Sequence, residues 1–163
     1  MKKRPEAEPE RVKHTLKKDA MITIKGIYDA EGSKDTIELL TCGRFYRRNN
    51  SYWVSYQESE TTGFEGHKTT LHIEEDKVTM RRSGVSESQL VIQKGMRHQC
   101  CYDTGYGSIT VGVSGKNVHS TLCDDGGTVD FSYSMDINTA LTSENRVIIK
   151  VMPEKCSAEE INS

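Results

Sequence analysis

In two predicted strands, the apolar side chains at every second residue form a stripe on one face, and charged side chains continue this stripe. The stripe of Tyr52–Tyr56, read at every second residue, runs on into Glu58 and Glu60, and the stripe of Val78–Met80 runs on into Arg82. Residues two apart on a strand share one face, so all three charges would point inward near one end of the sheet. Buried charges are costly unless they are paired, and a guanidinium suits a carboxylate in two-point contact. We therefore predict that Arg82 meets Glu58 or Glu60 inside the fold or at its mouth.

Two roles are open for this cluster. In the first, the charged residues form a structural ion pair that closes one end of the fold. In the second, Arg82 anchors the anionic head group of a bound ligand, with tyrosines beside it. A bulge near Gly63 would instead reverse the parity and leave the charges exposed. The candidate ligand-binding residues are Arg82, Glu58, Glu60, Tyr56 and Tyr102.

Histidine and cysteine side chains offer weaker candidates for chemistry. On strands, His98 would share a face with Cys100, and His119 with Cys123. Such residues can bind zinc or form a nucleophile and its base, but no recognised ligand spacing and no orienting third group accompany them. Cysteine is also commonly a small buried apolar residue. We assign no catalytic and no metal-ligating residue, expect no cofactor, and favour a binding protein over an enzyme.

Trp53 has the opposite parity to Tyr52 and Tyr56, so the pattern leaves open which face is the inner one there. A tryptophan can cover one end of a core or serve as a platform for a ligand. We interpret Trp53 as a core residue.

The elements that must position these residues are short strands with a period of two. All 13 glycines lie between Ala20 and Met152, whereas all three prolines lie outside this span, as fully paired strands require. Further strands are expected at His98–Asp103 and Val118–Cys123. The clearest alternating segments are Ile22–Ile24, Ile37–Leu39, Tyr52–Tyr56, Leu71–Ile73, Val78–Met80, Leu90–Ile92, Ile109–Val113, Val129–Met135 and Val147–Val151. The predicted turns are Glu31–Ser33, Arg48–Asn50, Lys94–Gly95, Gly115–Asn117 and Asp125–Gly127.

These elements predict an all-β fold, a single antiparallel β-barrel of about 8–11 strands over residues 20–153. Closing the sheet removes exposed strand edges, although a two-sheet sandwich is the competing arrangement. Residues 1–19 are expected to form a charged flexible tail or a short helix, and residues 154–163 a C-terminal tail.

Charge and composition exclude several classes of protein. The chain of 163 residues has a net charge of −2, and residues 1–19 carry +3 of it, which leaves −5 for the remainder. Because nucleic-acid binding needs a basic surface, we expect no nucleic-acid partner. We expect no membrane partner either, since no apolar run approaches the roughly 20 residues that cross a bilayer. No secretory signal is recognisable and the five cysteines include no CxxC pair, so we expect a cytoplasmic protein with free thiols.

The order of short motifs resembles the YwiB-like family of small bacterial proteins, from about Ala20 to Met152. The motifs are Met21–Gly26, Asp35–Leu39, Tyr56–Glu60 with Gly63 and Gly66, Arg82–Gly84, Tyr102–Gly107, Asp125–Gly127 and Ser143–Arg146. The resemblance implies a calycin-like (lipocalin-like) barrel in the cytoplasm and no known reaction. This chain departs from the family in its charged extension before Ala20 and in Gly105, where proline is more usual.

The leading functional hypothesis is a barrel that binds a small ligand, anionic or amphipathic, in its interior. The alternative is a fully packed barrel that meets a protein partner, not identified by the sequence, through its outer face or its tail. Small residues on inward stripes, Thr69, Ser88 and Gly112, favour a cavity. Large ones, Phe131, Tyr133, Tyr52 and Met80, favour a filled interior, so the sequence leaves both open.

Overall fold

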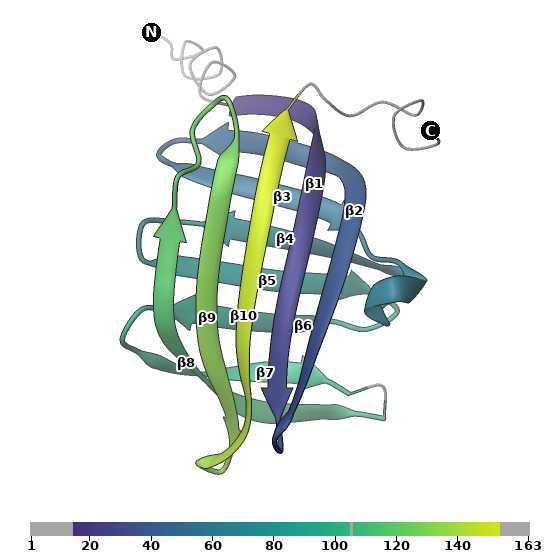
Figure 1. Ribbon diagram of the computed structural model, residues 1–163, viewed down its shortest axis with the longest axis vertical. Helices are drawn as coiled ribbons and strands as arrows, with labels where there is room; N and C mark the ends of the chain where they lie inside the picture. The colour runs from purple at the N-terminus through teal and green to yellow at the C-terminus, as the bar shows by residue number, and fades with distance from the viewer. Residues whose placement is uncertain (1–14, 105, 154–163) are drawn as a thin grey trace, which may run out of the picture.

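The computed structural model describes residues 15–104 and 106–153, which form ten antiparallel strands and one 3-10 turn (Figure 1). Each strand pairs with its neighbours in the chain, and the last strand pairs with the first, so that the sheet closes into a barrel. The strands are β1 (Thr15–Ala30), β2 (Ser33–Arg48), β3 (Ser51–Gln57), β4 (His67–Ile73), β5 (Lys77–Gly84), β6 (Ser88–Gln93), β7 (Arg97–Asp103), β8 (Ser108–Ser120), β9 (Gly127–Ile137) and β10 (Ala140–Pro153). The predicted barrel is confirmed, and the sandwich alternative is wrong.

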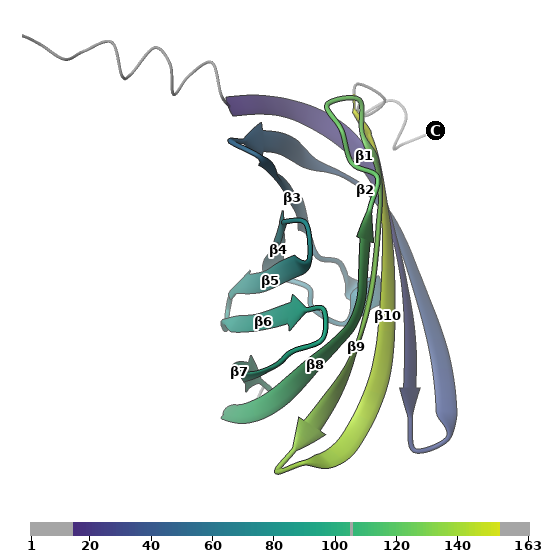
Figure 2. The ribbon, with the colours of Figure 1, turned by 90° about the vertical axis from the view of Figure 1, so that its left-hand side faces the viewer.

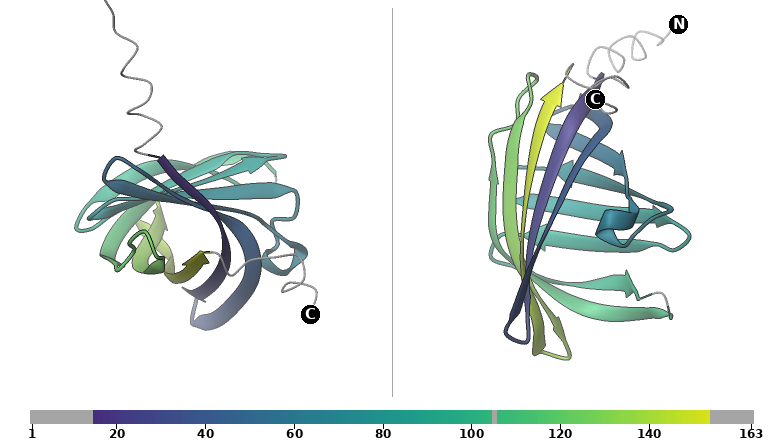
Figure 3. Two further views of the ribbon diagram at one scale, coloured as in Figure 1. Left: turned by 90° about the horizontal axis from the view of Figure 1, so that it is seen from above. Right: turned by 45° about the vertical axis from the view of Figure 1, so that its right-hand side comes forward.

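The strands differ in length on the two sides of the barrel. β1, β2, β8, β9 and β10 have 11 to 16 residues, whereas β3 to β7 have six to eight. Figure 2 shows the long strands running past the short ones, and the end-on view in Figure 3 shows the strands surrounding one interior. The side chains that can meet in that interior therefore come from strands far apart in the sequence.

One predicted turn is a bulge. The pairing of β8 with β9 shifts register between Gly115 and Asn117, and β8 then continues to Ser120. The strand expected at Val118–Cys123 is therefore the end of β8, which is why the barrel has ten strands. The β1–β2 hairpin has the predicted turn, where Glu31 and Gly32 both have positive φ angles of 54° and 78°.

The first strand begins earlier than the sequence indicated. β1 starts at Thr15, so residues 15–19 belong to the barrel and pair with β2 through Arg44–Arg48. The last strand, β10, extends to Pro153. The rest of the two expected tails, residues 1–14 and 154–163, lies outside the described residues. Among the residues that the structure describes, no helix has the length and apolar composition needed to cross a bilayer.

The cysteines differ from expectation at one position. Cys100, Cys101 and Cys123 are free, but Cys42 on β2 is disulfide-bonded. The prediction that all five thiols are free is therefore wrong at Cys42.

Trp53 was also misplaced. It lies on the outer face of β3 between Tyr46 and His72, with ring centroids 5.9 and 3.9 Å away, and is not part of the core.

One half of the interior is densely packed. Side chains of the neighbouring strands β2, β1, β10 and β9 are completely buried there, among them Phe45, Ile22, Ile149 and Phe131. Their alternation along the strands follows the predicted period of two, because neighbouring residues on a strand point to opposite faces. This apolar cluster joins β1 to β10 and holds the barrel closed.

Candidate functional site

The other half of the interior contains a cavity of about 370 Å³. Eight of the ten strands contribute to its lining, together with the connection between β3 and β4. Its apolar wall is formed by Ile24, Leu39, Met80, Leu90, Met135 and Val147. The connection between β3 and β4 adds the polar side chains of Glu58 and Thr62, and β5 adds Arg82, so the lining as a whole is amphipathic.

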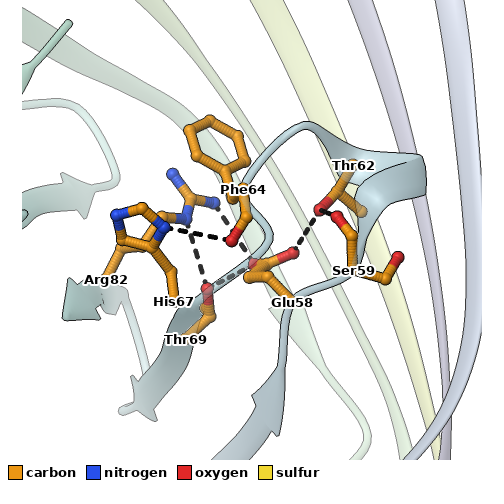
Figure 4. A network of polar contacts seen from close by, with 7 residues as sticks. All are labelled: Glu58, Ser59, Thr62, Phe64, His67, Thr69 and Arg82. Carbon is orange, nitrogen blue, oxygen red and sulfur yellow. Dashed lines mark hydrogen bonds and ion pairs between the residues drawn. The ribbon is translucent and has the colours of Figure 1, made fainter. Parts of the chain in front are cut away.

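A buried ion pair lies at the polar end of the cavity (Figure 4). Arg82 Nη2 lies 3.5 Å from Glu58 Oε2, and the two side chains are 15% and 2% exposed. Thr69 on β4 joins them, because its hydroxyl donates to Glu58 Oε2 and accepts from Arg82 Nε at 3.3 Å. Glu58 Oε1 accepts a hydrogen bond from Thr62 at 2.7 Å. The predicted contact between Arg82 and Glu58 is present, and it is held by two threonines.

The local fold after β3 explains why Glu60 does not join this pair. β3 ends at Gln57, and Ser59 caps the 3-10 turn η1 (Glu60–Thr62) by accepting from Thr61 N at 3.2 Å. Glu60 is the first residue of the turn and is exposed. Parity holds only while the strand continues. The prediction that Glu60 points inward is therefore wrong, and the cause is the turn rather than a bulge.

The same connection places an aromatic ring on Arg82. Gly63 follows η1 with a φ of 84°, a conformation that favours glycine, and the chain then brings Phe64 back over the interior. The Phe64 ring centroid lies 3.7 Å from the guanidinium carbon of Arg82, a cation–π contact. His67 Nδ1 and the Phe64 carbonyl oxygen are 3.0 Å apart, which fixes the position of the loop (Figure 4).

Tyrosines surround the ion pair on the cavity side. Tyr56 and Tyr102 were expected near Arg82, and both line the cavity. The sequence analysis did not single out Tyr28 as a site residue, and it took Tyr133 as a filler of the interior. Both line the cavity as well. Tyr28 continues the inward stripe of β1 beyond Gly26, which was the available signal. A Cβ at Gly26 would lie 2.6 Å from the Tyr28 hydroxyl, so the glycine leaves room for that ring.

These phenols are neutral over the usual pH range. Burial raises the pKa of Tyr28, Tyr56 and Tyr133 above the ordinary value of a phenol. The Arg82 guanidinium opposes this change at each of them, which shows that all three lie within its field. Neutral hydroxyls retain their protons and are available as hydrogen-bond donors.

The connection between β8 and β9 covers the apolar cluster at the opposite end of the barrel. A second, more open pocket of about 360 Å³ lies at this end, lined by Tyr52, Ile73 and Leu122 among others. Asp124 in this connection accepts a hydrogen bond from the Tyr52 hydroxyl at 3.3 Å and lies 3.4 Å from Arg47 Nη1. Leu122, from the same connection, packs against the apolar cluster. The interior thus has a packed end, which the β8–β9 connection covers and which we call the closed end, and a hollow end lined by the cavity described above.

The histidine and cysteine candidates do not converge. His98 Nε2 hydrogen-bonds Gln93 at 2.8 Å, whereas Cys100 is buried and accepts from the backbone N–H of Val91 at 3.4 Å. Burial raises the pKa of the Cys100 thiol, which keeps it protonated. His119 and Cys123 are exposed. Within residues 15–104 and 106–153, no three His, Cys, Asp or Glu side chains are arranged to hold a metal ion.

Comparisons with known proteins agree with this architecture. The sequence model of a family described as a domain of unknown function (DUF1934) matches residues 22–149, which include parts of all ten strands. The chain belongs to this family. A relative of this DUF1934 protein is the uncharacterised β-barrel protein YwiB of Bacillus subtilis (strain 168), 26% identical over 124 residues, which cover 75% of this chain and 86% of YwiB. The resemblance seen in the motifs is therefore confirmed.

A solved structure shows the same fold. The crystal structure of the ywiB protein from Bacillus subtilis matches the DUF1934 barrel with a TM-score of 0.77 at 20% sequence identity. The match covers 88% of this chain and 98% of that structure. At this level of identity the likeness concerns the fold alone.

Proposed function

We propose that this barrel binds a small amphipathic molecule in the cavity at its hollow end. The observation that carries the proposal is the combination, in one cavity, of an apolar wall with a few polar groups. Ligand sites typically have this composition, and a volume of about 370 Å³ lies at the small end of their range. The proposal assigns no reaction to the cavity, because its described lining residues include no histidine and no cysteine.

The alternative, a filled barrel that serves only as an interaction module, has less support. Of the large residues that were expected to fill the interior, Phe131 does so in the packed half. Met80 and Tyr133 instead line the cavity. A barrel selected only for its outer surface has no need of a hollow, because dense packing of the whole interior would stabilise it more.

The test is to fill the cavity and follow ligand binding. Native mass spectrometry of freshly purified protein should detect a retained small molecule, and the fluorescent probe anilinonaphthalene sulfonate should bind. In Val147→Phe, the new ring enters the cavity, so both signals should fall. Leu40→Phe is the matched control, because Leu40 is 60% exposed on the outer side of β2, and both signals should remain.

Two results would contradict the proposal. One is a parent protein that retains no molecule and binds no probe. The other is equal binding by the two phenylalanine variants, which would place the bound molecule outside the cavity.

A further inference from the structure

We infer that the ligand carries a single carboxylate, bound by Arg82 and the cavity tyrosines. The inference rests on the proposed function, since it assigns the chemical class of the molecule in the same cavity. Its basis is an excess of hydrogen-bond donors at the polar end of the cavity.

Arg82 is poorly used as a donor compared with two arginines on the barrel surface. Arg97 holds Asp136 through two bonds of 3.0 and 2.7 Å, and Arg146 holds Asp130 in the same way. The contacts of Arg82 are single and long, 3.3 Å to Thr69 and 3.5 Å to Glu58. A guanidinium has five N–H groups, so three of those on Arg82 have no acceptor among the described residues.

This difference is the reverse of what burial requires. The side chain of Arg82 is 15% exposed, whereas those of Arg97 and Arg146 are 39% and 53% exposed. A surface arginine can donate to bulk water, whereas the unpaired N–H groups of Arg82 need an acceptor inside the cavity, either water or a ligand. Arg82 lines the cavity, so the missing acceptors have space there.

The carboxylate oxygens of Glu58 do not supply the missing acceptors, because both already accept hydrogen bonds. Its Oε1 accepts from Thr62, and its Oε2 accepts from Thr69 and Arg82. Glu58 is the only carboxylate among the described lining residues. A cationic head group would therefore find its one partner already engaged and the positive charge of Arg82 beside it.

The tyrosines add donors rather than charge. Tyr28 and Tyr133 line the same space and lie in the field of Arg82. Their neutral hydroxyls can donate to a carboxylate oxygen, which strengthens binding because charge-assisted hydrogen bonds are the stronger ones. Since Glu58 already balances the charge of Arg82, the site suits one added negative charge better than the two of a phosphate monoester.

The experiment compares three probes with the same chain and different head groups. Octanoate, octanol and octylamine are titrated into the parent protein by calorimetry, with inorganic phosphate as a separate competitor. Octanoate should bind at least about tenfold more tightly than octylamine and more tightly than octanol. Phosphate should displace octanoate only weakly.

Two variants give opposite shifts. Arg82→Met should weaken octanoate binding by about tenfold or more and change octanol binding by less than about twofold. Glu58→Gln keeps the shape of the side chain but removes its competing charge, so octanoate binding should tighten severalfold. The probe series on the parent protein remains decisive if either variant fails to fold.

The outcomes separate this inference from the proposed function. Equal binding of octanoate and octanol, or tighter binding of octylamine, would overturn the carboxylate assignment while leaving a ligand-binding cavity. Strong displacement by phosphate would overturn the single charge. Absence of binding by all three probes, together with no retained molecule, would overturn both proposals.

Discussion

The two ends of the barrel interior are built from the same strands but have opposite character. Along β9, the inward stripe passes from Val129 and Phe131, which are completely buried, to Tyr133 and Met135, which line the cavity. Along β10, the stripe passes from Ile149 to Asn145 and Ser143. The change from packed core to cavity thus occurs along individual strands.

The difference teaches what makes the interior hollow. On β1, the stripe reaches Gly26 and then Tyr28, whose ring occupies the space above the glycine. On β5 the stripe reaches Arg82, whose buried charge needs polar or charged partners. The lining of this end includes a glycine and several hydrogen-bonding side chains, so its side chains do not fill the space between opposite walls as the apolar ones do. The polar residues that end the inward-facing rows of these strands are therefore also the reason why the cavity is there.

Truncating one leucine in each half should give the largest effect. Leu71 is 1% exposed and does not line the cavity, whereas Leu90 lines it. Leu71→Ala should lower the free energy of unfolding by about 4 kcal/mol, and Leu90→Ala by about 2 kcal/mol, because Leu90 already borders the cavity on one side. Urea denaturation followed by circular dichroism measures both. Equal losses would mean that the hollow end is packed in solution.

Much of this contrast could be predicted from the sequence. The period of two placed the strands, and parity alone brought Arg82 and Glu58 together from two strands separated by β4. The polar continuation of apolar stripes was therefore a valid signal for the site. It worked because β3 stays regular through Tyr56 and Gln57, the last residues before Glu58.

The failures have a physical cause in each case. Glu60 was misplaced because the capped turn after β3 depends on Ser59 and Gly63, which parity does not consider. Trp53 was misplaced because aromatic residues are stable on an outer face when they stack with neighbours, here Tyr46 and His72. The space left by Gly26 depends on the rotamer of Tyr28, which is a property of the assembled barrel.

Adding volume in each half should give an intermediate effect that differs in size between the two halves. Val129 is completely buried, so Val129→Phe overpacks the core and should cost about 1–3 kcal/mol of unfolding free energy. Val147→Phe extends into the cavity and should change stability by less than about 1 kcal/mol in either direction. Thermal and urea unfolding of the two variants compares them directly. A larger loss in Val147→Phe than in Val129→Phe would contradict the assignment of the cavity.

Removing one tyrosine hydroxyl at each end should give the smallest effect and the sharpest contrast in role. At the closed end, the Tyr52 hydroxyl donates to Asp124 at 3.3 Å, and Tyr52→Phe should cost about 0.5–1 kcal/mol of stability. At the hollow end, Tyr28→Phe should leave stability nearly unchanged, because that hydroxyl faces the cavity.

Octanoate affinity should respond in the opposite order. Tyr28→Phe removes a donor near Arg82 and should weaken octanoate severalfold, whereas Tyr52→Phe should leave it unchanged, because Tyr52 lies at the far end and does not line the cavity. Both variants keep the aromatic ring, so packing is conserved and only the hydroxyl is tested. If Tyr28→Phe lowers stability and leaves octanoate affinity unchanged, the hydroxyl has a structural role, and the hollow end differs from the closed end less than its lining indicates.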